Sequence, residues 1–140
     1  MKLLQLVVAI AFTFAFQSAK SQEKSYIYIY RGGQWSGSLT NFSVYLDGKK
    51  ICKLSNGKYI KVAVTPGVHE LEAKKSGLDI AKKQTSLSVE VEAGKSHYVS
   101  CTMKSSITRV RMEMTEVVAS NGKRDLEKMK EDNCSENLED

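Results

Sequence analysis

The fold class of this chain is decided by residues 44–71, VYLDGKKICKLSNGKYIKVAVTPGVHEL, in which apolar and polar side chains alternate. Alternation with a period of two is the pattern of a half-buried β-strand. Three pairs, Asp47-Gly48, Asn56-Gly57 and Pro66-Gly67, interrupt the alternation, and such pairs supply the backbone angles of tight turns. This stretch therefore predicts consecutive antiparallel strands.

The same pattern continues on both sides of this stretch and predicts about eight strands in the whole chain. They are expected at residues 26–30, 42–46, 51–54, 59–64, 68–73, 87–91, 97–103 and 107–116. The turn Ala93-Gly94-Lys95 is expected to join the sixth and seventh strands as a hairpin, and residues 76–83 are expected to form a loop. We predict an all-β fold, an antiparallel β-sandwich (immunoglobulin-like or prealbumin-like) of about seven to eight strands.

The first 21 residues, MKLLQLVVAIAFTFAFQSAKS, have the parts of an export signal. A lysine at position 2 precedes an apolar run that ends at Phe16, and small residues follow at Ala19 and Ser21. The run is shorter than the roughly 20 apolar residues that a membrane-spanning helix needs. We predict a signal peptide at residues 1–21 that is cleaved before Gln22, after which no transmembrane segment remains. An uncleaved anchor helix is the alternative.

The predicted sandwich domain occupies residues 22–118, and residues 119–140 differ from it in composition. Charged side chains dominate this end, and Leu126 and Met129 form its one apolar pair at helical spacing before the acidic terminus. So weak an apolar face predicts a short helix followed by a solvated, mobile tail over residues 131–140.

Lysine and arginine exceed aspartate and glutamate by 21 to 16, which gives the 140-residue chain a net charge of +5. The lysines are spread over predicted turns and strand edges, where they keep a β-protein soluble. Export, together with the lack of a basic stripe interleaved with aromatic residues, argues against nucleic acid as a partner. The sequence leaves the oligomeric state open.

Catalytic patterns are missing from the sequence. No glycine-rich loop leads into a predicted helix, so the usual phosphate cradle is not there. Acidic pairs such as Glu70 and Glu72 fall on the outward face of a predicted strand, where carboxylates are solvated. We predict a protein that is not an enzyme and needs no cofactor.

Three cysteines in an exported chain leave at least one of them unpaired. Cys52 and Cys101 fall in predicted strands, where each is either a small buried apolar residue or half of a Cys52–Cys101 disulfide. Cys134 falls in the predicted mobile tail, from which it could form an intermolecular disulfide with a partner or a second copy.

The two histidines, His69 and His97, stand alone in separate predicted strands. An open zinc or copper site would need both of them together with Cys101, which shares a strand face with His97. The alternative function is therefore a metal-binding or redox protein that uses His69, His97 and Cys101. Ordinary strand packing accounts for the same residues, so we assign no metal site.

Exposed aromatic residues give the better functional lead. Tyr26, Tyr28 and Tyr30 alternate along one predicted strand, and Trp35 lies in the polar loop that follows. Tyrosine and tryptophan are enriched where proteins contact partners or sugars, so these four are candidate binding residues. The other interpretation of the tyrosines is an inner layer of the sandwich, with their hydroxyl groups hydrogen-bonded at its rim.

Five segments arrive in the order typical of the domain of unknown function 2846, and over residues 26–116 the chain resembles that family. They are YIYIYR, VYLDGKKICKL, NGKY, TPGVHEL and GKSHYV. The part DGKK followed by PGVHELE is also similar to the PEGA-type surface domain. Cys52 and His97 depart from the family pattern, in which a glycine and a tyrosine are more usual. The resemblance implies an exported bacterial β-sandwich without a known catalytic residue, and it transfers no site residues.

These observations together predict an exported, non-catalytic β-sandwich module of the bacterial cell envelope. Its expected location is the periplasm, the outer surface or the medium, and its expected partner is a protein or a glycan.

Overall fold

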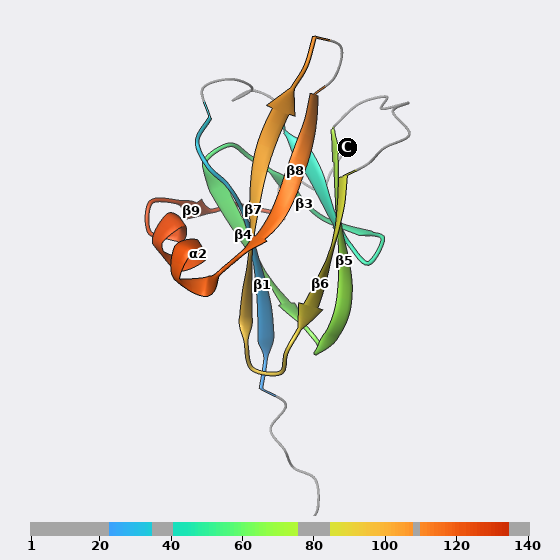
Figure 1. The fold of residues 1–140 in the computed structure, drawn as a ribbon, viewed down its shortest axis with the longest axis vertical. Coiled ribbons are helices and arrows are strands. Elements are labelled where there is room, and N and C mark those ends of the chain that lie inside the picture. The colour runs from blue at the N-terminus through green and yellow to red at the C-terminus, as the bar shows by residue number, and fades with distance from the viewer. Residues whose placement is uncertain (1–22, 35–40, 76–84, 108–109, 135–140) are drawn as a thin grey trace, which may run out of the picture.

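Alternating apolar residues form two β-sheets that pack face to face in the computed structural model, which describes residues 23–34, 41–75, 85–107 and 110–134 (Figure 1). The first sheet has the strand order β8 (Val110–Val117), β7 (Ser96–Ser105), β1 (Ser25–Arg31), β4 (Lys58–Val64), β9 (Lys130–Glu131). The second sheet has the order β3 (Lys49–Leu54), β2 (Phe42–Leu46), β5 (Gly67–Lys75), β6 (Thr85–Val91). The predicted all-β sandwich is confirmed.

Most neighbouring strands are antiparallel, but only the first of the three turns in residues 44–71 joins paired strands, because β4 belongs to the first sheet and both β3 and β5 belong to the second. The β2–β3 hairpin turns at Asp47 and Gly48, whose φ angles of 50° and 80° are those that a twist-matched two-residue turn requires. Two pairings differ from the prediction because they are parallel, namely β1 with β7 and β4 with β9. Parallel neighbours need a long connection, and such distant pairs are not visible in local alternation.

The turn at residues 93–95 does not form the predicted hairpin, because β6 belongs to the second sheet and β7 to the first. A turn reverses the chain, but the apolar face that each strand must bury decides which neighbour it pairs with. Ser25 fixes this crossing. Its hydroxyl donates to the carbonyl of Glu92 at 2.9 Å and accepts from the amide of Gly94 at 3.0 Å.

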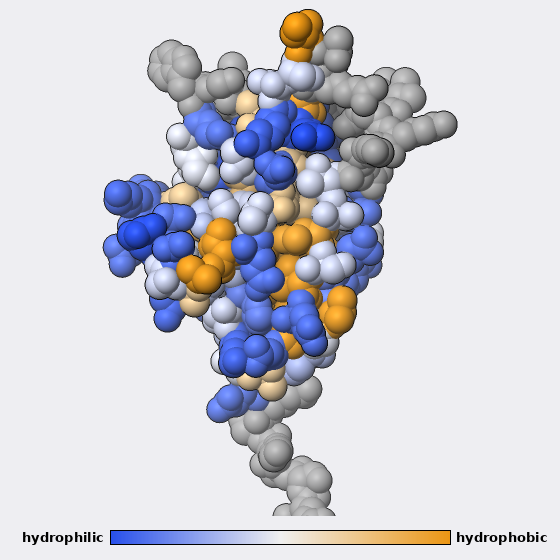
Figure 2. Space-filling model, in the orientation of Figure 1, coloured by the Kyte–Doolittle hydropathy of each residue, from blue (hydrophilic) through white to orange (hydrophobic). Residues whose placement is uncertain are grey.

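The core lies between the two sheets. Its fully buried members include Ile27 and Ile29 of β1, Val44 of β2 and Leu71 of β5. Arg31 at the end of β1 is also fully buried; its guanidinium carbon lies 5.6 Å from the centre of the Phe42 ring. Figure 2 shows apolar side chains between β8 and β6, where the edges of the two sheets come together.

The C-terminal segment is attached to the sandwich more extensively than the sequence predicts. The predicted short helix is present as α2 (Ala119–Leu126), which packs on β7. Its one buried residue, Gly122, lies so close to Tyr98 that a β-carbon there would overlap the tyrosine side chain. After α2 the chain forms β9 beside β4, so residues 131–134 are bound to the sandwich and do not belong to a mobile tail. Residues 135–140 lie outside the described ranges.

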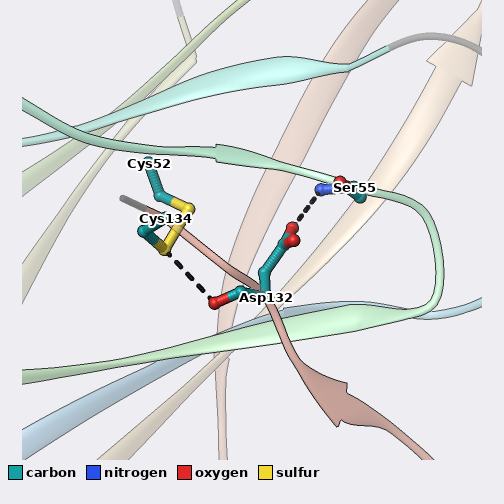
Figure 3. Close-up of a disulfide and its surroundings, with 4 residues drawn as sticks. All are labelled: Cys52, Ser55, Asp132 and Cys134. Atoms are coloured by element: carbon teal, nitrogen blue, oxygen red, sulfur yellow. Dashed lines mark hydrogen bonds between the residues drawn. A yellow bond between two sulfur atoms is a disulfide. The ribbon is translucent and has the colours of Figure 1, made fainter. Parts of the chain in front are cut away.

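A disulfide joins Cys52 of β3 to Cys134, 82 positions later in the chain (Figure 3). This bond corrects two hypotheses, because Cys52 does not pair with Cys101 and Cys134 forms no disulfide with a second molecule. Cys101 is a small buried residue of the core, which was the other interpretation of the strand cysteines. Asp132 holds the same segment in place. Its carboxylate accepts from the amide of Ser55 at 2.7 Å, and its amide donates to the carbonyl of Tyr59 at 2.8 Å.

The predicted signal peptide, residues 1–21, lies outside the described part of the chain. Within the ranges that the structure does describe, no helix is both long enough and apolar enough to cross a membrane.

Reduction of the disulfide is expected to lower the free energy of unfolding by about 2–4 kcal/mol, because the bond closes a long loop in the unfolded chain. Cys134→Ser should show the same loss in urea unfolding, and reductant should then have no further effect on that variant. Thiol labelling of the unfolded, unreduced protein should modify Cys101 alone. Labelling of all three cysteines would contradict the pairing.

Gly122→Ala is expected to destabilise the protein by about 1–3 kcal/mol, because the added methyl group would overlap Tyr98. Helix propensity alone predicts the opposite, a gain of about 1 kcal/mol. The sign of the change in urea unfolding thus tests whether α2 packs on β7. Ser120→Ala, on the exposed side of α2, is the matched control and should change stability little. A stabilised Gly122→Ala would overturn this packing.

Candidate functional site

The tyrosines of β1 lie on the outer face of the first sheet. In a strand, neighbouring side chains point to opposite faces, and Ile27 and Ile29 occupy the core. Tyr26, Tyr28 and Tyr30 therefore point away from the second sheet. They do not form an inner layer of the sandwich, which was the alternative interpretation of these residues.

α2 covers one end of this tyrosine row. Tyr30 and Tyr98 are only 2% and 4% exposed. The Tyr30 hydroxyl donates to the Asp125 carboxylate at 2.8 Å. Burial, and then this hydrogen bond, raise the pKa of Tyr30 to about 12. At this end the aromatic side chains attach the C-terminal segment to the sheet.

The other end of the row stays partly open and carries a cation. Lys61 of β4 places its ammonium 4.2 Å from the centre of the Tyr26 ring and 5.6 Å from that of Tyr28. Tyr28 stacks on Tyr98, with ring centres 5.0 Å apart and planes 7° apart, and is tilted against Tyr59 at 6.3 Å. Tyr59 lies opposite Tyr30 and continues this face toward the covered end. We call Tyr26, Tyr28, Tyr59 and Lys61 the tyrosine–lysine surface.

The electrostatics of this surface keep Lys61 charged. A hydrogen bond with Tyr28 is the main reason why the pKa of Lys61 is raised above its ordinary value of 10.5. An ammonium over a tyrosine face is attracted by the electron density of the ring. The arrangement thus presents a fixed positive charge beside partly exposed aromatic rings.

Sequence reasoning missed Lys61 as a functional candidate. The signal was present, because Tyr59, Lys61 and Ala63 alternate outward along one predicted strand. What the sequence did not reveal is that β4 pairs with β1, which sets Lys61 directly opposite Tyr28. Trp35, the remaining aromatic candidate, lies outside the described residues.

The second sheet also carries a lysine ammonium over a tyrosine ring. The Lys74 ammonium of β5 is 4.2 Å from the centre of the Tyr45 ring of β2. Lys74 also forms an ion pair with Glu72 at 3.0 Å, which offsets its charge. Tyr45 is thus an internal comparison for Tyr26, because it has the same cation contact on a different sheet.

The histidines do not form the metal site of the alternative hypothesis. His69 lies in β5 of the second sheet and His97 in β7 of the first. Each has its own carboxylate partner at 2.7 Å, Asp47 for His69 and Glu116 for His97. Among the residues that the structure describes, no three of the types His, Cys, Asp and Glu are grouped to hold a metal ion.

Cys101 is sealed in the core. Its side chain is 2% exposed and packs among the apolar residues of both sheets. Burial raises the pKa of its thiol to about 12, so the reactive thiolate is suppressed at neutral pH.

His69 is held by two acceptors. Nδ1 lies 2.7 Å from Asp47 Oδ2, and Nε2 lies 2.7 Å from the carbonyl oxygen of Thr65. Two acceptors require a proton on both ring nitrogens, which is the charged form. The hydrogen bond to Asp47, followed by that to Thr65, raises the pKa of His69 above its ordinary value of 6.5.

This ion pair predicts a pH dependence of stability. Because the folded-state pKa of His69 lies above the unfolded value, the stabilisation is complete below about pH 6.5 and is lost as pH rises through the folded pKa. Asp47→Asn should lower the His69 pKa in an NMR titration and flatten the stability profile in that range. A wild-type protein that gains stability across the same range would contradict the pairing.

Comparison with known proteins identifies the family of this chain. No curated protein matches the chain, and no solved structure does so either. A family model described as "Protein of unknown function (DUF2846)" matches residues 21–114, more than half of the 140-residue chain. The match agrees with the resemblance seen in the sequence. The chain therefore belongs to the DUF2846 family of proteins of unknown function.

Proposed function

We propose that this protein is an exported, non-catalytic β-sandwich module of the bacterial cell envelope that binds an envelope component through its tyrosine–lysine surface. The observation that carries the proposal is the position of Lys61 over the Tyr26 and Tyr28 rings on the open end of the first sheet. At the opposite end of the tyrosine row, Tyr30 has a structural role under α2. At the Tyr26 end, α2 does not cover the rings.

Two observations support export. The first 21 residues have the charge, length and small-residue ending of a signal peptide. The Cys52–Cys134 disulfide is the second, because disulfides form and persist in oxidising compartments outside the cytosol.

The state of the titratable groups supports a non-catalytic role. Tyr30 is bound to Asp125. Each histidine has a carboxylate on Nδ1 and a second partner on Nε2, which is the carbonyl oxygen of Thr65 for His69 and the amide of Glu92 for His97. Catalysis needs a nucleophile or base that can reach a substrate. The buried Cys101 thiol and these occupied partners do not supply one.

A glycan suits the tyrosine–lysine surface better than a protein does. A stable protein interface has an apolar core, but the large exposed apolar residues of the described ranges, Val68, Ile107 and Val118, are not part of this surface. Tyrosine offers an apolar ring face and a polar edge, which match the apolar and hydroxyl sides of a sugar. Lys61 adds attraction for acidic polysaccharide.

Export is tested by expressing the full chain in a bacterial host and fractionating the cells. The protein is expected outside the cytoplasm. Its measured mass should equal that of a mature chain whose first residue is Gln22. A full-length protein in the cytoplasmic fraction would overturn the envelope assignment.

Binding is tested by incubating the purified protein with envelope polysaccharide and with envelope protein extract from the source cells. Tyr26→Ala and Lys61→Ala are each expected to weaken polysaccharide binding by about tenfold, the effect of losing one well-placed contact. Tyr45→Ala is the matched control and should bind as the wild type does. Unfolding curves should show that all three variants remain folded.

Retained binding in Tyr26→Ala and Lys61→Ala would exclude the tyrosine–lysine surface. An equal loss in Tyr45→Ala would show that the attraction is not specific to the first sheet. Binding to an envelope protein but not to polysaccharide, with the same variant pattern, would keep the surface and replace the glycan with a protein.

A further inference from the structure

A cavity of about 560 Å³ lies between the outer face of the first sheet and the C-terminal end of α2. It is separate from the tyrosine–lysine surface, since none of the four residues of that surface lines it. Pockets that hold small ligands commonly have volumes of roughly 300–1,000 Å³. The cavity therefore has the size of a small-molecule site.

Glycines keep this space open. Gly32, Gly33 and Gly57 form part of the wall. A β-carbon built on Gly32 or Gly33 would meet no atom within 4 Å, so the space beside them is empty of protein atoms. The volume is thus created by small residues of the chain after β1 and before β4.

Two cations from the C-terminal segment line the cavity. Arg124 lies in the last turn of α2, and Lys128 follows four positions later. Arg124 donates to the side-chain oxygen of Asn121 at 3.3 Å. Within the described part of the chain, neither Arg124 nor Lys128 forms an ion pair, so both charges are available to a ligand.

The remaining polar groups of the cavity can bind hydroxyl groups of a ligand. The hydroxyl-bearing residues Ser100 and Thr102 of β7 line the cavity, as does Asp125. Asp125 already accepts from the Tyr30 hydroxyl, and a carboxylate can accept further hydrogen bonds from ligand hydroxyl groups. The two cations can bind one anionic group of a ligand, whereas the Asp125 carboxylate repels a second anionic group placed beside it and favours hydroxyl groups there.

We propose that this cavity binds a hydroxylated monocarboxylic acid of monosaccharide size, that is, a sugar acid. The ligand carboxylate lies between Arg124 and Lys128, since a guanidinium can bind a carboxylate through two parallel hydrogen bonds. The ligand hydroxyl groups bond to Asp125 and to the hydroxyls of β7. This proposal goes beyond the function proposed above and does not rest on the tyrosine–lysine surface.

The test is calorimetric titration of the purified protein with glucuronate, with neutral glucose and the dicarboxylate glucarate, whose second carboxylate would lie beside Asp125, as comparison ligands. Glucuronate is expected to bind one per chain. Glucose lacks the carboxylate and should bind at least about tenfold more weakly than glucuronate does. Repulsion by Asp125 should also make the binding of the dianion weaker than that of glucuronate.

Arg124→Gln and Lys128→Gln are each expected to weaken glucuronate binding by about tenfold. Lys123→Gln is the matched control: Lys123 lies on α2 beside Arg124, is exposed and does not line the cavity. Gly33→Leu should weaken binding by at least about tenfold because the added side chain narrows the cavity at its wall, and the room around Gly33 should allow that variant to fold.

The proposal would be overturned if glucuronate did not bind at concentrations up to about 10 mM. A dissociation constant above that value is too weak for a specific site. Equal losses in Lys123→Gln and Arg124→Gln would also overturn it, since they would indicate nonspecific attraction to a basic helix. So would full binding by Gly33→Leu. Tyr26→Ala should leave glucuronate binding unchanged, so the failure of one site can be told from the failure of the other.

Discussion

The two-faced pattern of β1 is the constraint on which the rest of the structure depends. β1 lies between β4 and β7 in the middle of the first sheet, with isoleucines inward and tyrosines outward. The isoleucines require a second sheet to cover them. The tyrosines create an outer face that is too apolar to leave fully in water, and α2 covers part of it. Both layers of the protein are therefore consequences of the sequence YIYIY.

The disulfide makes that cover durable. Cys52 belongs to the second sheet, whereas Cys134 follows β9 of the first, so one covalent bond joins both sheets through the C-terminal segment. β9 contributes only two residues to the first sheet, and so short a strand adds little stability by itself. The position of Asp125 against Tyr30, and of Arg124 and Lys128 at the cavity, thus depends on a segment fixed at its far end.

Strands could be read from the sequence because their cause is local. Alternation and the Asp47-Gly48 pair act over a few residues, and both are found as predicted. The β2–β3 pair follows from its tight turn, but the partners in the rest of the two sheets could not be predicted where they depend on contacts between distant residues. Cys52 meets Cys134 across a separation of 82 positions, and Lys61 meets Tyr28 only because β4 pairs with β1. The turn at residues 93–95 failed as a hairpin for the same reason: its geometry is local, but sheet membership is not.

Gly122 shows why the cover over the tyrosines is partial. A glycine inside a helix costs about 1 kcal/mol relative to alanine, and α2 has eight residues, no side-chain cap at its start and Gly122 as its only buried residue. Such a helix has little stability of its own. It forms because Gly122 lets the backbone approach Tyr98 closely, and that contact fixes where α2 lies on the sheet. Gly122 against Tyr98 and Asp125 bonded to Tyr30 fix this short helix over one end of the tyrosine row, and the tyrosine–lysine surface at the other end stays open.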